Sequence, residues 1–106
     1  EWPGPPIGDE EGELISTALG KKRSILLAHH GQLSAGKTIE QGAVLAFHFE
    51  RAAKMQLAAM AAGKVQPLPP AAGKHAHDYR LKSAPLNATF QYYARRVLKV
   101  APELLS

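Results

Sequence analysis

The longest periodic stretch of the sequence runs from Thr38 to about Ala62 and predicts one long helix. Thr38 and Gln41 form the T-x-x-Q pattern of a helix start, in which side chains bond backbone N–H groups of the first turn. Apolar residues then recur at spacings of three and four, namely Ala46, Phe49, Ala53, Leu57 and Met60. A chain of 106 residues has room for one modest core. We therefore expect this stripe to pack on a sheet within a single domain.

Shorter elements precede this helix. Acidic residues in a first turn and an apolar patch predict a helix over Asp9–Leu19, with Gly20 as its C-terminal stop. The apolar run "ILLA" predicts a strand over Ser24–His30 that is covered on both faces, and "QLSAG" predicts a second strand over Gln32–Gly36. This order implies a layered α/β or α+β architecture with at most a small sheet.

The second half of the chain divides into a loop and a helix. Residues 64–82 are rich in proline and glycine and predict a surface loop, in which His75 and His77 would be solvated. A C-terminal helix is expected over 85–101, because apolar residues share one face until Pro102 ends the pattern.

Composition excludes several classes of protein. The chain has no cysteine, so any metal site would use histidine and carboxylate ligands. No apolar run approaches the ~20 residues of a membrane span, and no signal peptide is visible, so we expect a soluble, cytoplasmic protein without a membrane partner. The net charge of +4 comes from scattered basic pairs without interleaved aromatic residues, which argues against a nucleic-acid partner. The opening Trp-Pro-Gly-Pro-Pro run, without an initiator methionine, is typical of the middle of a longer protein.

One segment matches the pattern of a phosphate-binding loop. Gly31–Thr38 satisfies G-x-x-x-x-G-K-[ST] between a predicted strand and a predicted helix, which is the context that the motif requires. However, no later apolar run ends in an aspartate that could hold Mg²⁺. The interior "QLSA" is typical of a strand and not of a glycine-rich phosphate cradle. Nucleotide binding is therefore the less favoured alternative.

Two adjacent histidines, His29 and His30, end the first predicted strand beside Gly31. A neutral imidazole at a strand end suits a metal ligand, because the strand fixes the direction of the ring and the glycine leaves room for an ion and a substrate. The alternative is that one of the two is simply a hydrogen-bonded residue at a sheet edge. The residues alone leave both interpretations open.

The stretch "ILLAHHGQLSAGKTIEQGAVLAFHFERAAKMQLAA" resembles the C-terminal half of the class II aldolase and adducin family, which includes sugar-phosphate aldolases of the fuculose-phosphate type. The family pattern is an apolar strand, Asn-His-Gly, a short strand to a glycine and often Thr or Asp, and a long helix with an acidic residue mid-way. The resemblance covers roughly Glu11 to Pro70.

Several residues correspond to functional positions of that family. By resemblance, His30 matches the metal-binding histidine, Gly36 and Thr38 match the turn into the helix, and Glu50 matches the helical acid. His29 occupies the place usually held by asparagine. No residue of this chain is assigned a catalytic role.

The resemblance implies a layered α/β/α domain, a sheet flanked by helices, of which residues 1–106 are the C-terminal portion. It also implies a symmetric homo-oligomer, a tetramer in this family. In such lyases a divalent metal, usually zinc, with iron or manganese as alternatives, is held by three histidines. The metal polarises a sugar, sugar-phosphate or small hydroxy-carbonyl substrate while a carboxylate moves the proton, so that an enediolate can form.

The same resemblance places the other two ligands in a His-x-His pair upstream of the region that this chain matches. A lone histidine does not retain catalytic zinc, so this segment alone is expected to be inactive. The non-catalytic adducin members offer a second interpretation, in which the chain is an association module.

Overall fold

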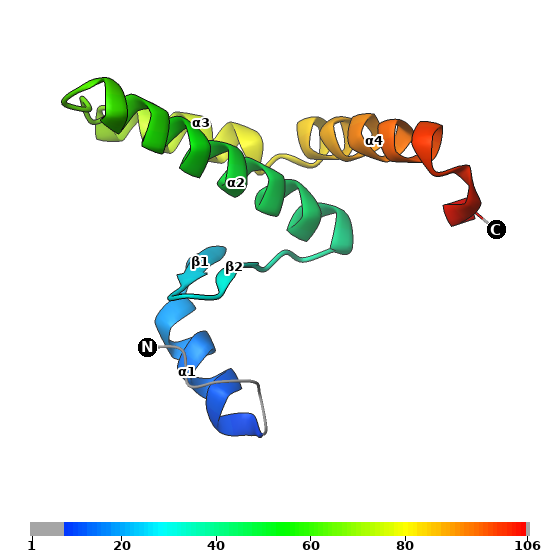
Figure 1. Ribbon diagram of the computed structural model, residues 1–106, viewed down its shortest axis with the longest axis horizontal. Helices are drawn as coiled ribbons and strands as arrows, with labels where there is room; N and C mark the ends of the chain where they lie inside the picture. Colours follow the sequence, from blue (N-terminus) through cyan, green and yellow to red (C-terminus); the bar gives the residue numbers. More distant parts are fainter. Residues whose placement is uncertain (1–7, 106) are drawn as a thin grey trace. The chain divides into compact units, whose positions relative to one another are not determined.

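The computed structural model describes residues 8–105 of the chain. Figure 1 shows the order of its elements: α1 (Asp9–Leu19), β1 (Ser24–Leu27), β2 (Gly31–Ser34), α2 (Ile39–Ala62), α3 (Pro70–Arg80), α4 (Ser83–Val100) and the short 3-10 helix η1 (Pro102–Leu105). The Pro-rich opening run lies outside the described residues. The chain forms two compact units, Glu1–Phe49 and Glu50–Ser106, and α2 contributes to both.

Helix α1 has the bounds that the sequence predicted. Three acidic residues fill its first turn, where negative charge is favoured by the exposed backbone N–H groups. Gly20 ends the helix with a φ of 55°, a conformation that glycine adopts without strain, and its N–H donates to the Ser16 carbonyl across 2.9 Å. The acidic first turn and the terminal glycine are therefore local signals that agree with the observed bounds of this helix.

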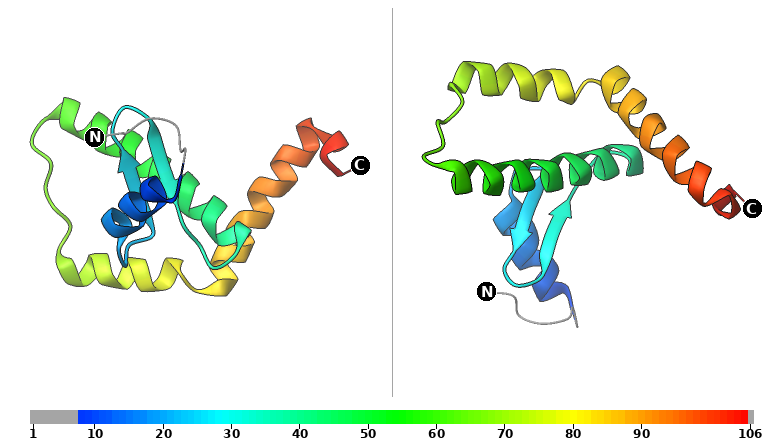
Figure 2. Two further views of the ribbon diagram at one scale, coloured as in Figure 1. Left: turned by 90° about the horizontal axis from the view of Figure 1, so that it is seen from below. Right: turned by 45° about the horizontal axis from the view of Figure 1, so that its top comes forward.

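Strands β1 and β2 form an antiparallel hairpin, which Figure 2 shows as two neighbouring arrows joined by a short turn. The register pairs Ser24 with Ser34 at the open end and Leu27 with Gly31 at the turn. The two serine hydroxyls lie 2.8 Å apart and form a cross-strand hydrogen bond. The hairpin is thus fixed at both ends.

The described residues are mostly helical and contain this one two-stranded sheet, in agreement with the expectation of at most a small sheet. The layered α/β/α sheet that the resemblance implies is not present in these residues. The first strand was predicted to reach His30 but ends at Leu27. The second was predicted as Gln32–Gly36 but spans Gly31–Ser34. Leu26 is 68% exposed, so the expectation of a strand covered on both faces was wrong here. An apolar run does not distinguish a hairpin strand from a buried parallel strand, which explains the error.

The first part of α2 packs in the first unit. Val44 is only 2% exposed and is one of two buried apolar side chains among the described residues. The Gln32 side-chain amide donates to the Ala46 carbonyl across 3.2 Å and ties β2 to the helix. The predicted end of this helix at about Ala62 is confirmed. Gly63 then takes a φ of 144°, where the chain leaves the helix.

Helix α3 lies inside the segment 64–82 that the sequence predicted to be a loop, so that prediction was wrong for Pro70–Arg80. Proline breaks the interior of a helix but suits its first turn, because its missing N–H has no intrahelical partner there. Pro70 occupies this position, and it is followed directly by two alanines, the residue with the highest helix propensity. The prolines thus mark the start of a helix.

Helix α4 covers Ser83–Val100, against the predicted range 85–101. Pro85 lies in its first turn, and its carbonyl accepts a hydrogen bond from the Thr89 hydroxyl across 2.8 Å. Leu86 is 6% exposed and is the buried apolar side chain among the described residues of the second unit. Pro102 follows the helix and opens η1.

Candidate metal centre

His29 and His30 lie in the turn of the hairpin. The His30 N–H donates to the Leu27 carbonyl across 3.1 Å, which closes a four-residue turn. His29 holds the third position of this turn with a φ of 60° and is the one non-glycine residue with positive φ among those described. Type II turns require positive φ at that position. Asparagine, aspartate and histidine adopt it more readily than other non-glycine residues.

This geometry explains why histidine can stand at position 29, where the family pattern usually has asparagine. The position selects residues that tolerate the left-handed conformation, and both asparagine and histidine do. Both imidazoles are exposed, and His30 directly precedes β2. The turn therefore presents His30 at the start of a strand that a cross-strand bond and the Gln32–Ala46 bond hold in place.

The phosphate-loop pattern does not form a phosphate cradle. Its first four residues, Gly31–Ser34, are strand β2, and their backbone groups belong to the hairpin. At its end, the Gln41 N–H donates to the Thr38 hydroxyl across 3.2 Å, and the Lys37 N–H donates to Gln41 Oε1 across 2.6 Å. These N–H groups are satisfied by the helix cap and do not point into an anion site.

Gly36 allows the chain to pass close to the start of α2. A Cβ atom at this position would lie 2.5 Å from the Gly42 nitrogen, closer than any real contact allows. Only glycine fits there without a shift of the backbone. The structure thus gives a steric reason for the glycine at the turn into the helix.

The remaining candidates lie on helices of the second unit. Glu50, the expected helical acid, is exposed and forms an ion pair with Lys54 across 3.1 Å, one turn along α2. His75 and His77 were expected in a solvated loop but lie on α3, where both are exposed. They occupy different sides of the helix because they are two positions apart.

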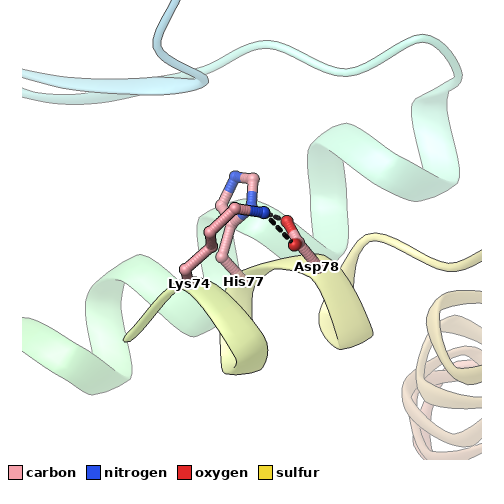
Figure 3. A network of polar contacts seen from close by, with 3 residues as sticks. All are labelled: Lys74, His77 and Asp78. Atoms are coloured by element: carbon pink, nitrogen blue, oxygen red, sulfur yellow. Dashed lines mark hydrogen bonds and ion pairs between the residues drawn. The ribbon is translucent and has the colours of Figure 1, made fainter. Parts of the chain in front are cut away.

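His77 belongs to a small polar network, drawn in Figure 3. Asp78 Oδ2 accepts a hydrogen bond from Lys74 Nζ across 2.5 Å, and Asp78 Oδ1 is hydrogen-bonded to His77 Nδ1 across 3.0 Å. The hydrogen bond from Lys74, and then that from His77, lowers the pKa of Asp78 from 3.8 to about 2. This network was not predicted from the sequence, although Lys74 and Asp78 have the i, i+4 spacing that signals such a pair.

The described residues do not fit a complete metal centre. No group of three histidine or acidic side chains within residues 8–105 is arranged to hold an ion. Catalytic zinc needs three protein ligands, and His30 can supply one. Any further ligands would have to come from outside this part of the molecule.

The segment that carries the hairpin matches a known family. The model of the class II aldolase and adducin N-terminal domain matches residues 3–57, slightly more than half of the chain. The chain belongs to the class II aldolase and adducin family. The match begins earlier and ends earlier than the range inferred from the sequence, and it leaves α3 and α4 outside. No curated protein matches the chain.

As a class II aldolase and adducin family member, the chain carries His30, Gly36, Thr38 and Glu50 within the matched segment. The hairpin turn and the capped helix follow one another there in the order that the family pattern has. None of the helices in residues 8–105 is both long enough and apolar enough to cross a membrane.

Proposed function

We propose that the chain belongs to a class II aldolase-like lyase and that His30 supplies one ligand to its divalent metal, zinc or alternatively iron or manganese. The substrate class is a sugar, a sugar phosphate or a small hydroxy-carbonyl compound. The observation that supports this proposal is the hairpin turn: an exposed imidazole follows a left-handed residue inside the segment that matches the family.

The hydrogen bonds that hold the turn favour a role for His30 as a metal ligand over a role as an ordinary surface residue. A metal ligand must be held in a fixed direction by its surroundings. The hydrogen bond from the His30 N–H to the Leu27 carbonyl fixes the hairpin at its turn. The hydrogen bond between the Ser24 and Ser34 hydroxyls fixes it at the open end. His29 then acts by shaping the turn, and its imidazole has no assigned role as a ligand.

The lyase reaction needs a complete centre, which the described residues do not form. The chain by itself should therefore not cleave a substrate, and the remaining ligands and the general base are proposed to lie outside residues 8–105. The layered α/β/α sheet implied by the resemblance would likewise be completed by strands that lie outside residues 8–105.

The test is aldol cleavage by the protein purified from its native source. A panel of hydroxy-carbonyl compounds, with and without a phosphate group, should contain at least one substrate. Replacement of His30 by alanine should reduce cleavage to background, whereas His75→Ala, on exposed α3, should retain it. Cleavage by the His30→Ala protein at the unchanged rate would contradict the proposal.

An adducin-like association module is the second candidate. It is favoured by α4, which lies outside the matched segment and exposes both charged and apolar side chains. In that case the native protein would cleave no member of the panel. Its function would then be carried by surfaces that bind other proteins.

A further inference from the structure

Helix α1 presents an acidic face without basic partners. Asp9, Glu10 and Glu13 are exposed, and α1 contains no basic residue. No basic side chain among the described residues forms an ion pair with these three, which we call the acidic face. Their spacing of i, i+1 and i+4 places them within an arc of about 100° on the helix. Leu14, at i+5, is 62% exposed beside them.

Helix α4 presents the opposite charge. Arg95, Arg96 and Lys99 are exposed, and α4 contains no acidic residue. No carboxylate in the described part of the chain forms an ion pair with these three, which we call the basic face. Val100 is 82% exposed beside them. Arg96 is oriented by the Tyr92 hydroxyl, which accepts its hydrogen bond across 3.3 Å.

The two faces have the same spacing along their helices. The basic residues also occupy positions i, i+1 and i+4, with an exposed apolar residue at i+5. In an α-helix the rise from i to i+4 is about 6 Å, so the two charged sets are equal in length as well as opposite in sign. Each face is also followed, at the next position along its helix, by an exposed aliphatic side chain, Leu14 on α1 and Val100 on α4.

We propose that the basic face of α4 binds the acidic face of α1 from a second copy of this chain. Leu14 of one copy and Val100 of the other then share an apolar contact beside the charges. A polyanion such as nucleic acid or an anionic lipid surface would match the basic charge, but it would leave the acidic face of α1 without a complementary partner. Because each copy carries both faces, one kind of contact can build a dimer or a closed ring.

This inference does not depend on a metal ligand at His30. It concerns α4, which the family match does not cover, and α1, whose charged residues are unrelated to the hairpin. Contacts between exposed charges weaken as salt shortens their range, from about 10 Å at 0.1 M to about 3 Å at 1 M. Association through these faces must therefore depend on ionic strength.

The first measurement is sedimentation of the chain at low and at high ionic strength. The unmodified chain should show at least twice the monomer mass at low salt and the monomer mass at high salt. Reversal of either face should give a monomer at low salt. The basic-face variant carries Arg95→Glu, Arg96→Glu and Lys99→Glu, and the acidic-face variant carries Asp9→Lys, Glu10→Lys and Glu13→Lys.

The decisive measurement is a mixture of the two variants. In the mixture every reversed face meets a complementary face on the other variant, so association should return to the level of the unmodified chain. A matched control reverses three basic residues in the turn after α1, Lys21→Glu, Lys22→Glu and Arg23→Glu. It changes the net charge by the same amount as the basic-face variant and should leave association unchanged.

Three results would overturn the proposal. One is a monomer at low salt for the unmodified chain, whether or not that monomer binds vesicles of anionic phospholipid. Another is association that the control abolishes as fully as the basic-face variant. The third is a mixture of two helical variants that stays monomeric. If circular dichroism shows that a reversed helix unfolds, the neutral set Asp9→Asn, Glu10→Gln and Glu13→Gln replaces the acidic-face variant and should weaken association at least tenfold.

Discussion

The backbone N–H of Lys37 donates a hydrogen bond to Oε1 of Gln41 across 2.6 Å, which places the side chain of the third helical residue over the entry to α2. The Gln41 N–H in turn donates to the Thr38 hydroxyl. These two bonds satisfy backbone donors that a phosphate-binding loop would have to leave available. The lysine and threonine that complete the phosphate-loop pattern thus belong to a helix cap.

Loss of the cap should destabilise α2. The Thr38→Ala variant removes the hydroxyl that accepts the Gln41 N–H, and the free energy of unfolding should fall by about 1 kcal/mol. Urea unfolding followed by circular dichroism measures this change. Thr38→Ser keeps the hydroxyl and should lose much less. Equal stability of the alanine and serine variants would show that the hydroxyl does not cap the helix.

The cap also predicts that nucleoside triphosphates do not bind. Titration of the chain with a labelled triphosphate and Mg²⁺ should show no saturable signal, because Gly31–Ser34 is a strand and the following N–H groups are occupied. Saturable binding that is lost in Lys37→Ala and retained in His30→Ala would contradict this expectation and support a nucleotide site.

Lys74 should control the ionisation of Asp78. The folded-state pKa of Asp78 is lowered from 3.8 to about 2, so ionised Asp78 stabilises α3 above about pH 4, and this contribution is lost as the pH falls through about 2. In Lys74→Gln the pKa should rise toward its usual value, with only the weaker bond from His77 left to lower it. A pH titration of the Asp78 carboxyl carbon by NMR measures both values.

The control for this titration is Lys54→Gln, because Lys54 pairs with Glu50 on α2, whereas Lys74 and His77 are the groups that lower the pKa of Asp78. It should leave the Asp78 pKa at about 2. An Asp78 pKa that is the same in all three proteins would mean that the Lys74 bond does not form in solution.

Glu11 should destabilise the first unit. It is 8% exposed, and neither carboxylate oxygen has a hydrogen-bond partner. A buried polar group without a partner costs about 1–3 kcal/mol, which exceeds the roughly 0.3–1 kcal/mol that an acidic residue gains in a first helical turn. Glu11→Met should therefore raise the free energy of unfolding by about 1 kcal/mol, measured by urea unfolding. The exposed control Glu13→Met should not raise it, and a destabilised Glu11→Met protein would disprove the interpretation.

The elements that the sequence predicted well are those with local signals. Helix α1 has an acidic first turn and a terminal glycine, and α2 has a cap and a long apolar stripe, so both were located closely. Helix α3 was missed because prolines near its start were interpreted as breakers, although Pro70 at the first position favours a helix. The end of β1 was misplaced because the left-handed turn at His29 has no signal in the apolar pattern.

The candidate site was predictable only in part. His30 was predicted at the end of the first strand, but it lies in the exposed turn between β1 and β2. Whether other side chains surround it depends on contacts between distant segments, which periodicity does not contain. The Lys74–Asp78 pair could have been found from its spacing, whereas the lack of a partner for Glu11 could not.

The metal content of the protein from its native source, determined together with its intact mass, tests the central claim most directly. Elemental analysis of the unmodified protein, of His30→Ala and of the control His75→Ala should find about one zinc, iron or manganese per chain in the first and third and almost none in the second, because catalytic zinc requires all three of its protein ligands. Equal metal content in all three proteins would show that His30 binds no metal and would contradict the account.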